Sequence, residues 1–554
     1  MKGSLVTQSH QLHEALIGGQ FHINADLVIP KFSTPANFNL WAKVLIGENS
    51  WGSAKYLPEL PKALEDREQL FIASFLCLSQ MLFELGRMPI FDQPVVRSLG
   101  FSKQSQGRYA ISLELPIVQF ISPLAYQIPI KAALAICNWM AQNIPTTENK
   151  RKVFNTIEQQ VLQPLYQHVP AGKSTIPILK VAHALGIPFF HLGLGVYQLG
   201  WGSKARRIDR TMIELDSVIG SRLAQHKVVT ANLLRLAGLP APTHAIALTE
   251  QEAIGAAAQI GFPVVIKPTD RDRGEGVTVN ITDNLAVKIA FSAAQKLAIS
   301  KQVIVEREVP GVCHRLFIVN GQLLYAVKRL PISITGDGVL TIDQLVNDQL
   351  AHQMQKPPWV RSRIRPIDEL AVKVLAQLGL TPQSIPAIGM VIPLRPIESS
   401  EWGGIHEDVT HSVHPDNLSA AIAATRLFGL QVAGIDIITS DITKPWFENG
   451  AIINEVNFAP LLGRTEITRS YIPKFLSLLI DKKGTIPIEF FELKREGLQR
   501  QAELTKQGLR CFFTSYETTM DWSGNVIAMP LFNIKERVKA LICRSDVDAI
   551  IVQN

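Results

Sequence analysis

The chain has 554 residues, 47% of them hydrophobic and only 19% charged, which predicts three or four domains and excludes a largely disordered protein. Its net charge is +7, but the basic residues are dispersed, which disfavours nucleic acid binding and favours pockets for phosphates and carboxylates. The five cysteines form no CxxC pair, which argues against a zinc cluster or a disulfide framework and favours a reducing compartment.

Residues 1–165 mix apolar helices with short strands and contain no chemical motif. The first residues lack an apolar signal core, and the apolar stretch LFIASFLCLSQMLFELG is shorter than a membrane span. We therefore expect an α+β N-terminal domain in a cytoplasmic protein without a membrane segment.

The stretch QHVPAGKSTIPIL contains GKST, the ending of a phosphate-binding P-loop. A P-loop also requires a glycine at position 167 and a preceding strand, but the chain has Gln167 after a segment of helical periodicity. We predict instead a turn at 170–172, followed by a helix that Ser174 or Thr175 caps.

From residue 227 the predicted elements become regular. VVTANLLRLAG predicts a helix ending at Gly238, and LTEQEAIGAAAQIG predicts a helix with a capping box of Thr249 and Glu252. Strands are predicted for FPVVIKPT, QVIVEREVPG, HRLFIVNG and QLLYAVKRLP, with an Asn320–Gly321 hairpin turn between the last two. LQVAGIDIITS and AIINEVNFAP predict a further antiparallel pair.

The glycine loop after FPVVIKPT is a candidate phosphate site. Gly274 and Gly276 allow backbone N–H groups to approach a phosphate, and Lys267 at the end of the strand can reach its oxygens. Taken alone, the loop is more typical of a hairpin with solvated charges. The assignment therefore depends on residues elsewhere in the chain.

Three oxygen-bearing side chains in the strand pair LQVAGIDIITS and AIINEVNFAP support the assignment of a phosphate site. Glu455 and Asn457 are two residues apart, so they point to one face of a strand, and Asp436 lies on the neighbouring strand. Oxygen ligands of this kind suit Mg²⁺, which takes its remaining ligands from phosphates and water.

In chain order, Lys227, VVIKP…GEGV, VIVEREVPG, GIDII and INEVN resemble the ATP-grasp fold of D-alanine–D-alanine ligase and glutathione synthetase. Across about 170–475, VYQLGWGSKARRI, GDGVLTIDQLV, LAQLGLTPQSIPAIGMVIPLR and EDVTHSVHPDN resemble cyanophycin synthetase. The resemblance implies a multidomain α/β and α+β protein. Its parts would be an N-terminal domain (1–165), an ATP-grasp domain (166–484) with an inserted lid at about 330–400, and a Mur-ligase-like remnant (485–554).

The resemblance also implies ATP and Mg²⁺ as cofactors and assigns residues to them. The nucleotide would be held by Lys227, Lys267, the Gly274–Glu275–Gly276 loop, Glu306 and the backbone of 307–309, including Val309. Two Mg²⁺ ions would be bound by Asp436, Glu455 and Asn457. Arg315, Lys328 and Arg329 would face the phosphates.

The resemblance places two segments near the acyl group of the substrate. Arg395 would meet the carboxylate or acyl phosphate, although a surface arginine after a strand fits the sequence as well. The stretch SSEWGG departs from the family's Asn-x-Ser-x-Gly-Gly pattern, with Ser399 and Glu401 in the places of Asn and Ser. A carboxylate there would repel a carboxylate substrate or attract an amine, so we expect a different acceptor.

Residues 485–554 resemble part of a Mur-ligase module but lack its glycine–lysine loop. We therefore expect a nucleotide-free remnant that docks on the ATP-grasp domain or on another subunit.

The implied function is an ATP-dependent carboxylate–amine ligase with one active site, forming a peptide or isopeptide bond through an acyl phosphate. Its substrates would be amino acids or peptides containing Asp, Arg or β-aspartyl-arginine, and the chain would form a homo-oligomer. The alternative is a catalytically reduced accessory paralogue that assembles with a complete, full-length synthetase.

Overall fold

The computed structural model describes residues 20–27, 35–51, 66–92, 94–101, 109–169, 172–271, 274–362, 364, 366–398 and 404–553. The chain divides into two compact units. Unit 1 comprises Met1–Arg210, Leu462–Arg464 and Ile472–Asn554, and unit 2 comprises Thr211–Leu461 and Thr465–Tyr471. These units do not follow the three predicted domains one for one, because residues 485–554 group with the N-terminal residues.

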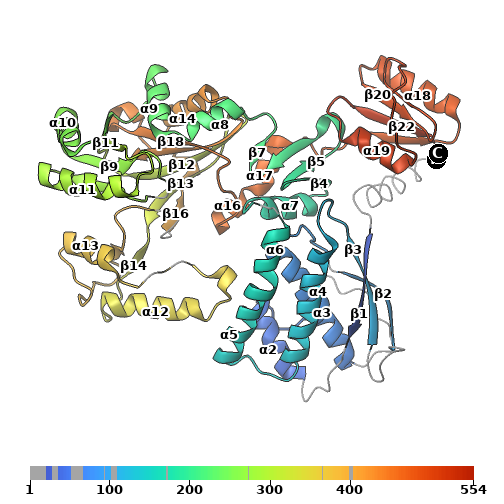
Figure 1. Ribbon diagram of the computed structural model, residues 1–554, viewed down its shortest axis with the longest axis horizontal. Helices are drawn as coiled ribbons and strands as arrows, with labels where there is room; N and C mark the ends of the chain where they lie inside the picture. Colours follow the sequence, from blue (N-terminus) through green and yellow to red (C-terminus); the bar gives the residue numbers. More distant parts are fainter. Residues whose placement is uncertain are drawn as a thin grey trace. The chain divides into compact units, whose positions relative to one another are not determined.

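Unit 1 begins with an antiparallel sheet in the order β1-β3-β2 and a set of helices (Figure 1). The strands are β1 (Gln20–Leu27), β2 (Val95–Phe101) and β3 (Tyr109–Pro116). The helices are α2 (Pro35–Leu45), α3 (Asp66–Leu85), α4 (Pro123–Met140), α5 (Thr147–Ile157), η2 (Glu158–Leu162) and α6 (Gln163–His168).

Helix α3 is the one helix among the described residues that is long and apolar enough to cross a membrane. Its stretch Glu68–Leu85 is 61% buried inside the protein. Phe71, Phe75 and Phe83 on this helix are completely buried. Such burial is typical of a core helix.

The region of the GKST sequence forms helix α7 (Thr175–Ala184). The helix begins where the sequence predicts, but the Ser174 hydroxyl does not cap it and instead accepts a hydrogen bond from the Leu462 N–H at 3.0 Å. Residues 170–171 of the predicted turn lie outside the described residues. Three antiparallel strands follow, β4 (Phe189–Gly193), β5 (Val196–Leu199) and β6 (Arg206–Asp209).

The C-terminal part of unit 1 is a sheet in the order β19-β22-β20-β21. Its strands are β19 (Ile488–Phe491), β20 (Cys511–Thr514), β21 (Thr519–Met520) and β22 (Ala549–Gln553), and its helices are α18 (Lys494–Lys506) and α19 (Ile534–Ile542). Strands β19, β22 and β20 are parallel. The sheet docks on the β5–β6 region, where Trp201 joins its core and Gln198 Nε2 donates to the Ile542 carbonyl at 2.8 Å. Helix α17 (Ile472–Leu479) precedes it.

Unit 2 contains an antiparallel four-stranded sheet in the order β10-β9-β11-β8. Its strands are β8 (His244–Ala247), β9 (Val264–Pro268), β10 (Thr278–Ile281) and β11 (Val303–Arg307), and its helices are α10 (Glu250–Ile260) and α11 (Asn284–Leu297). The predicted capping box of Thr249 and Glu252 at the start of α10 is confirmed.

A second antiparallel sheet of unit 2 has the order β16-β13-β12-β17-β18. Its strands are β12 (Val312–Val319), β13 (Gln322–Pro331), β16 (Gly404–Asp408), β17 (Val432–Thr439) and β18 (Ile452–Phe458). Helices α8 (Val218–Ala224), α9 (Lys227–Leu236) and α14 (Pro415–Leu427) pack on it, as the label positions in Figure 1 also show. The Asn320–Gly321 turn joins β12 to β13 as predicted.

A small subdomain is inserted between β13 and β16, within the predicted lid region. It contains β14 (Ser333–Thr335), β15 (Val391–Pro393), α12 (Ile342–Met354), η4 (Pro358–Val360) and α13 (Glu369–Gln377). Its apolar core includes Ile334, Val346 and Leu375. The shorter elements of unit 2 are β7 (Met212–Ile213), η5 (Thr410–Ser412), α15 (Trp446–Asn449) and α16 (Glu466–Ser470).

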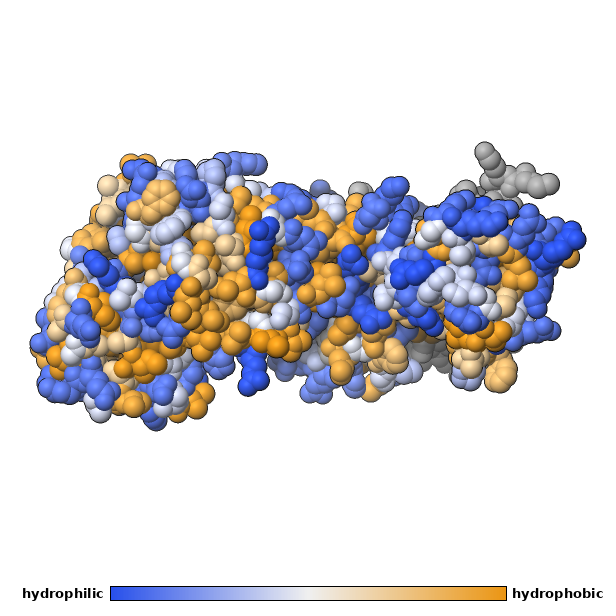
Figure 2. All heavy atoms as spheres, turned by 90° about the horizontal axis from the view of Figure 1, so that it is seen from above, coloured by the Kyte–Doolittle hydropathy of each residue, from blue (hydrophilic) through white to orange (hydrophobic). Residues whose placement is uncertain are grey.

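On the molecular face shown in Figure 2, apolar and hydrophilic side chains are intermixed. Exposed large apolar residues occur in both units, for example Val218 and Ile219 in unit 2 and Phe532 in unit 1. Exposure of single apolar residues is ordinary for a folded chain.

Candidate functional site

One face of the five-stranded sheet collects charged and amide side chains from three adjacent strands. Arg315 on β12 lies directly opposite Asp436 on β17, and Asp436 lies opposite Glu455 on β18. Asn457 lies two residues beyond Glu455, opposite Gly434. Because residues directly opposite each other in an antiparallel pair project to the same face, these side chains share one surface.

Asp436 is the centre of this group. Both of its oxygens accept hydrogen bonds from Arg315, from Nε at 2.7 Å and from Nη2 at 2.6 Å, and Arg329 Nη1 donates to Oδ2 at 3.3 Å. Burial raises the pKa of the Asp436 carboxyl, but the charges of Arg315 and Arg329 and the hydrogen bonds from Arg315 and Asn457 outweigh this effect and hold the pKa below its ordinary value. Asp436 is therefore an anion at neutral pH.

Glu455 and Asn457 complete the predicted metal set. Glu455 Oε1 lies 4.0 Å from Lys227 Nζ, and its side chain is 34% exposed. Asn457 Nδ2 donates to the Gly434 carbonyl at 3.3 Å, which leaves its side-chain oxygen as an acceptor. Among the described residues, no three His, Cys, Asp or Glu side chains group as a metal site. The donors here are two carboxylates and one amide on one face, a set that suits Mg²⁺, which needs few protein ligands.

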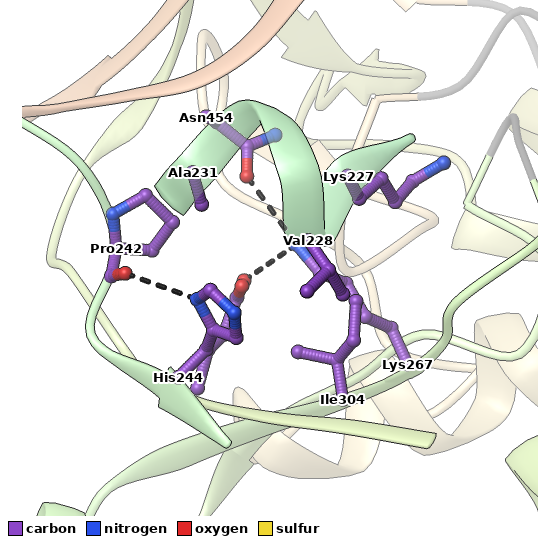
Figure 3. A pocket seen from close by; sticks show the side chains of 9 residues that line it. Lys227, Val228, Ala231, Pro242, His244, Lys267, Ile304 and Asn454 are labelled. Atoms are coloured by element: carbon purple, nitrogen blue, oxygen red, sulfur yellow. Dashed lines mark hydrogen bonds and ion pairs between the residues drawn. The ribbon is translucent and has the colours of Figure 1, made fainter. Parts of the chain in front are cut away.

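Lys267 and Glu306 form a buried pair on the four-stranded sheet. Lys267 Nζ donates to Glu306 Oε1 at 2.7 Å and to Asn454 Oδ1 at 3.4 Å. Figure 3 shows Lys267 and Asn454 reaching toward each other above His244, whose Nδ1 contacts the Pro242 carbonyl. The pocket that these residues line has a volume of about 10 Å³, room for about one water molecule.

The predicted phosphate loop follows β9. Gly274 and Gly276 have positive φ angles of 77° and 70°, and a Cβ on Gly276 would lie 2.9 Å from the Pro268 ring. Glycine is therefore required at 276 for both conformation and space. Glu275 is largely exposed, with its carboxylate 3.9 Å from Arg271 Nε.

Two further predicted nucleotide contacts lie at the ends of these elements. Lys227 begins helix α9, and its Nζ donates to the Arg271 carbonyl at 2.7 Å, which ties the helix to the start of the loop. Val309 follows β11 and is half-buried, next to Glu308, whose N–H donates to the Pro263 carbonyl. The structure thus brings Lys227 to Glu455 and pairs Lys267 with Glu306, and both lysines line the same pocket.

A register shift separates Lys328 from Arg315. The hairpin pairs Val319 with Gln322, and regular pairing from there would place Lys328 on the same face as Arg315. A β-bulge between Phe317 and Ile318 shifts the register by one residue, so that Arg315 lies opposite Val327. A shift of one residue moves every later side chain to the other face of the strand.

Arg329 therefore lies on the face of Arg315, and Lys328 lies on the opposite face. Lys328 Nζ is 3.5 Å from the exposed carboxylate of Glu407. The prediction that Arg315, Lys328 and Arg329 all face the phosphates is therefore corrected for Lys328. The structure brings Arg329 to Asp436 and leaves Lys328 on the other face of the sheet.

Arg395 is buried inside the inserted subdomain and is not a surface arginine. Its Nη2 donates to Asp368 Oδ2 at 2.8 Å, and its Nη1 donates to the Leu394 carbonyl at 2.7 Å. Asp368 also caps helix α13. The structure therefore joins Arg395 to the fold of the subdomain.

Two residues lie next to this face that the sequence did not assign to it. Glu398 is only 7% exposed and pairs with Arg329 Nη2, and His406 on β16 lies opposite Arg329. Nothing in the sequence placed Glu398 or His406 at Arg329. The departures at Ser399 and Glu401 lie outside the described residues.

Comparison with known proteins agrees with this architecture. Residues 226–315 match the family described as "Carbamoyl-phosphate synthase L chain, ATP binding domain". Cyanophycin synthetase of Geminocystis herdmanii is 34% identical over 303 residues, 54% of this chain and 35% of that protein. Cyanophycin synthetase of Crocosphaera subtropica is 33% identical over 389 residues, 68% of this chain and 42% of that protein.

Among solved structures, the bifunctional glutathione synthetase from Pasteurella multocida is 23% identical and has a TM-score of 0.43. The match covers 64% of this chain and 50% of that chain. The family match, the sequence similarity and the two antiparallel sheets identify unit 2 as an ATP-grasp fold.

The predicted resemblance of the chain to cyanophycin synthetases is likewise confirmed. The chain spans about 35 to 42% of the length of these curated relatives.

Proposed function

We propose that the chain is an ATP-dependent carboxylate–amine ligase that forms a peptide or isopeptide bond through an acyl phosphate. In this reaction a substrate carboxylate attacks the terminal phosphorus of ATP and releases ADP. The amine nitrogen then bonds to the acyl carbon, the acyl C–O bond breaks, and inorganic phosphate and a proton leave. The observation that carries the proposal is the face of Asp436, Glu455 and Asn457 beside Arg315.

The residues of this face have distinct roles in the proposal. Asp436, Glu455 and Asn457 would hold Mg²⁺, which neutralises phosphate charge when bound. Arg315, fixed by both oxygens of Asp436, offers a positive charge to the transferred phosphoryl group. Burial strengthens this attraction because little water screens it.

A second group would bind the nucleotide. Lys227 and Lys267 would contact phosphates, and the Gly274–Gly276 loop would cover them. Glu306 and the backbone near Val309 would hold the adenosine. Support comes from the two lysines, which lie with Asn454 on the lining of one pocket.

Amino acids or short peptides are the proposed substrates, and Arg395 stays a proposal for the acyl group. The test is phosphate release by the purified protein with ATP, Mg²⁺ and panels of amino acids and β-aspartyl-arginine peptides. We expect release that depends on both a carboxylate and an amine. Tight ATP binding without turnover on any pair would instead favour the accessory paralogue, as would co-purification with a full-length synthetase.

We further propose a single nucleotide site per chain, in a cytoplasmic homo-oligomer. Residues 485–554 lack a glycine–lysine loop and have an apolar core typical of a packing module. Equilibrium titration with a non-hydrolysable ATP analogue should give a stoichiometry near one. A value near two, with one site surviving Lys267→Ala, contradicts this proposal.

A further inference from the structure

Glu398 is a buried carboxylate that none of the proposed roles uses. Its side chain is 7% exposed and makes an ion pair with Arg329 Nη2, and its Oε1 lies 3.9 Å from His406 Nε2. Arg329 also donates to Asp436. One guanidinium therefore links Glu398 to the carboxylate at the centre of the face.

The backbone beneath Glu398 leaves room for this carboxylate. A Cβ on Gly404 would lie 2.5 Å from Glu398 Cγ and 2.7 Å from the Leu330 carbonyl oxygen, so a side chain at 404 would displace Glu398. Among the described residues, the buried Nδ1 atom of His406 has no hydrogen-bond partner. The position thus combines a buried anion with an unused polar atom.

The balance of charges around Arg329 indicates a role for Glu398. Arg315 and Arg329 carry two positive charges, which Asp436 and Glu398 together balance, and Arg329 contacts both carboxylates. An acyl phosphate that bound to Arg329 would bring at least one new negative charge to this place. Glu398 would then be a buried carboxylate without full compensation, which is unfavourable unless a cation arrives with the substrate.

We propose that Glu398 binds the ammonium group of the acceptor before this group releases its proton to solvent and attacks as a free amine, so that Glu398 selects acceptors that carry an ammonium. This inference rests on the proposed ligase function and deepens it by naming the group that recognises the second substrate. Burial raises the pKa of the Glu398 carboxyl, but His406 and Arg329 outweigh this and keep the pKa low, so the carboxylate stays ionised. An ionised carboxylate in a poorly hydrated place binds an ammonium strongly.

The test compares a charged nucleophile with an uncharged one in Glu398→Gln, which removes the charge but keeps the shape. Hydroxylamine is uncharged at neutral pH and traps an acyl phosphate as a hydroxamate. L-Aspartate, L-arginine and β-aspartyl-arginine are the charged acceptors. We expect kcat/KM for the charged acceptor to fall about 10- to 100-fold, the range for one charge-assisted hydrogen bond, while hydroxamate formation stays close to that of the parent.

Glu407→Gln is the matched control, because Glu407 is exposed on β16, on the face opposite that of His406, and both reactions should persist in it. If both reactions fall equally in Glu398→Gln, Glu398 is only a counterion of Arg329 and the inference is wrong. If neither falls, Glu398 binds no acceptor. If Glu398→Gln does not fold, Glu398→Asp replaces it in the test. Because Glu398→Asp keeps the negative charge, it must retain the preference for charged acceptors, and a variant without this preference overturns the inference.

The parent protein separates this inference from the function on which it rests. A parent that forms no hydroxamate with any carboxylate overturns the ligase proposal and this inference with it. A parent that forms hydroxamate, combined with equal losses in Glu398→Gln, leaves the ligase proposal standing.

Discussion

The five-stranded sheet of unit 2 and the C-terminal sheet of unit 1 differ in how far the side chains of their ion pairs are buried. In unit 2, the side chains of Arg315, Arg329 and Asp436 are 18%, 15% and 3% exposed and lie on a face of the sheet. In the C-terminal sheet, the arginines of the ion pairs Arg500–Glu489, Arg510–Asp548 and Arg544–Asp546 are 34%, 41% and 38% exposed. That sheet is covered instead by apolar side chains, including Phe512 and Ile550.

This difference bears on why unit 2 buries charged side chains. Removing ionised groups from water costs several kcal/mol per ion, which pairing only partly offsets. The described ion pairs Arg500–Glu489, Arg510–Asp548 and Arg544–Asp546 of the C-terminal sheet are all partly exposed. The buried charges of unit 2 are therefore better explained by chemistry than by stability, and the following variants test this contrast.

The largest effect is expected for Glu455→Gln, which removes one negative charge from the proposed Mg²⁺ set. Turnover of ATP should fall about 100- to 1000-fold, the range for losing one preorganised electrostatic group. The melting temperature should stay unchanged, because the side chain is partly exposed. Glu489→Gln in the C-terminal sheet is the control and should keep full turnover. A Glu455→Gln protein with most of its turnover contradicts the assignment of this face.

Ile550→Ala tests the other side of the comparison. Ile550 is completely buried in the core of the C-terminal sheet, so its truncation should lower the free energy of unfolding of unit 1 by about 2 to 4 kcal/mol. Turnover per folded molecule should not change. Calorimetry gives the first quantity and phosphate release the second. Loss of turnover without loss of stability would show that this sheet takes part in the chemistry.

Lys267→Ala should weaken binding of an ATP analogue about 10- to 100-fold, because it removes one charge-assisted contact with phosphate. It also leaves Glu306 buried without its main partner, so the protein should unfold at a lower temperature. Lys288→Ala, on exposed helix α11, is the matched control. Equal affinities of the two variants in a titration would remove Lys267 from the nucleotide site.

The smallest effect is expected for Asp548→Asn at the rim of the C-terminal sheet. Hydrogen bonds from Arg510 lower the pKa of Asp548 from 3.8 to about 2. The resulting stability is fully present above pH 3.8 and is lost as the pH falls through about 2. The variant should therefore be about 1 kcal/mol less stable than the parent at neutral pH, and the two should converge in acid. A difference that is constant with pH contradicts this.

Local signals in the sequence predicted much of unit 2. Alternation along a strand placed Glu455 and Asn457 on one face, and the Asn320–Gly321 turn and the Thr249 capping box were readable from residue type. Such features depend on neighbours in the chain, which a single sequence displays directly.

What could not be predicted depends on register and on distant contacts. The bulge beside Phe317 has no strong sequence signal, yet it exchanges the faces of Lys328 and Arg329. The contact of Glu398 with Arg329 joins segments separated by the inserted subdomain. The docking of residues 488–553 on the Trp201 region likewise joins distant parts of the chain.

The shared guanidinium of Arg329 also constrains how this protein can change during evolution. A substitution that neutralises Arg329 leaves Glu398 buried without its arginine partner, whereas neutralising Glu398 alone leaves a cation in excess. Each single substitution should lower the stability of the protein. The double substitution should lower it by less than the sum of the two single substitutions. Natural homologues should therefore gain or lose Arg329 and Glu398 as a pair, with acceptor preference changing abruptly between lineages.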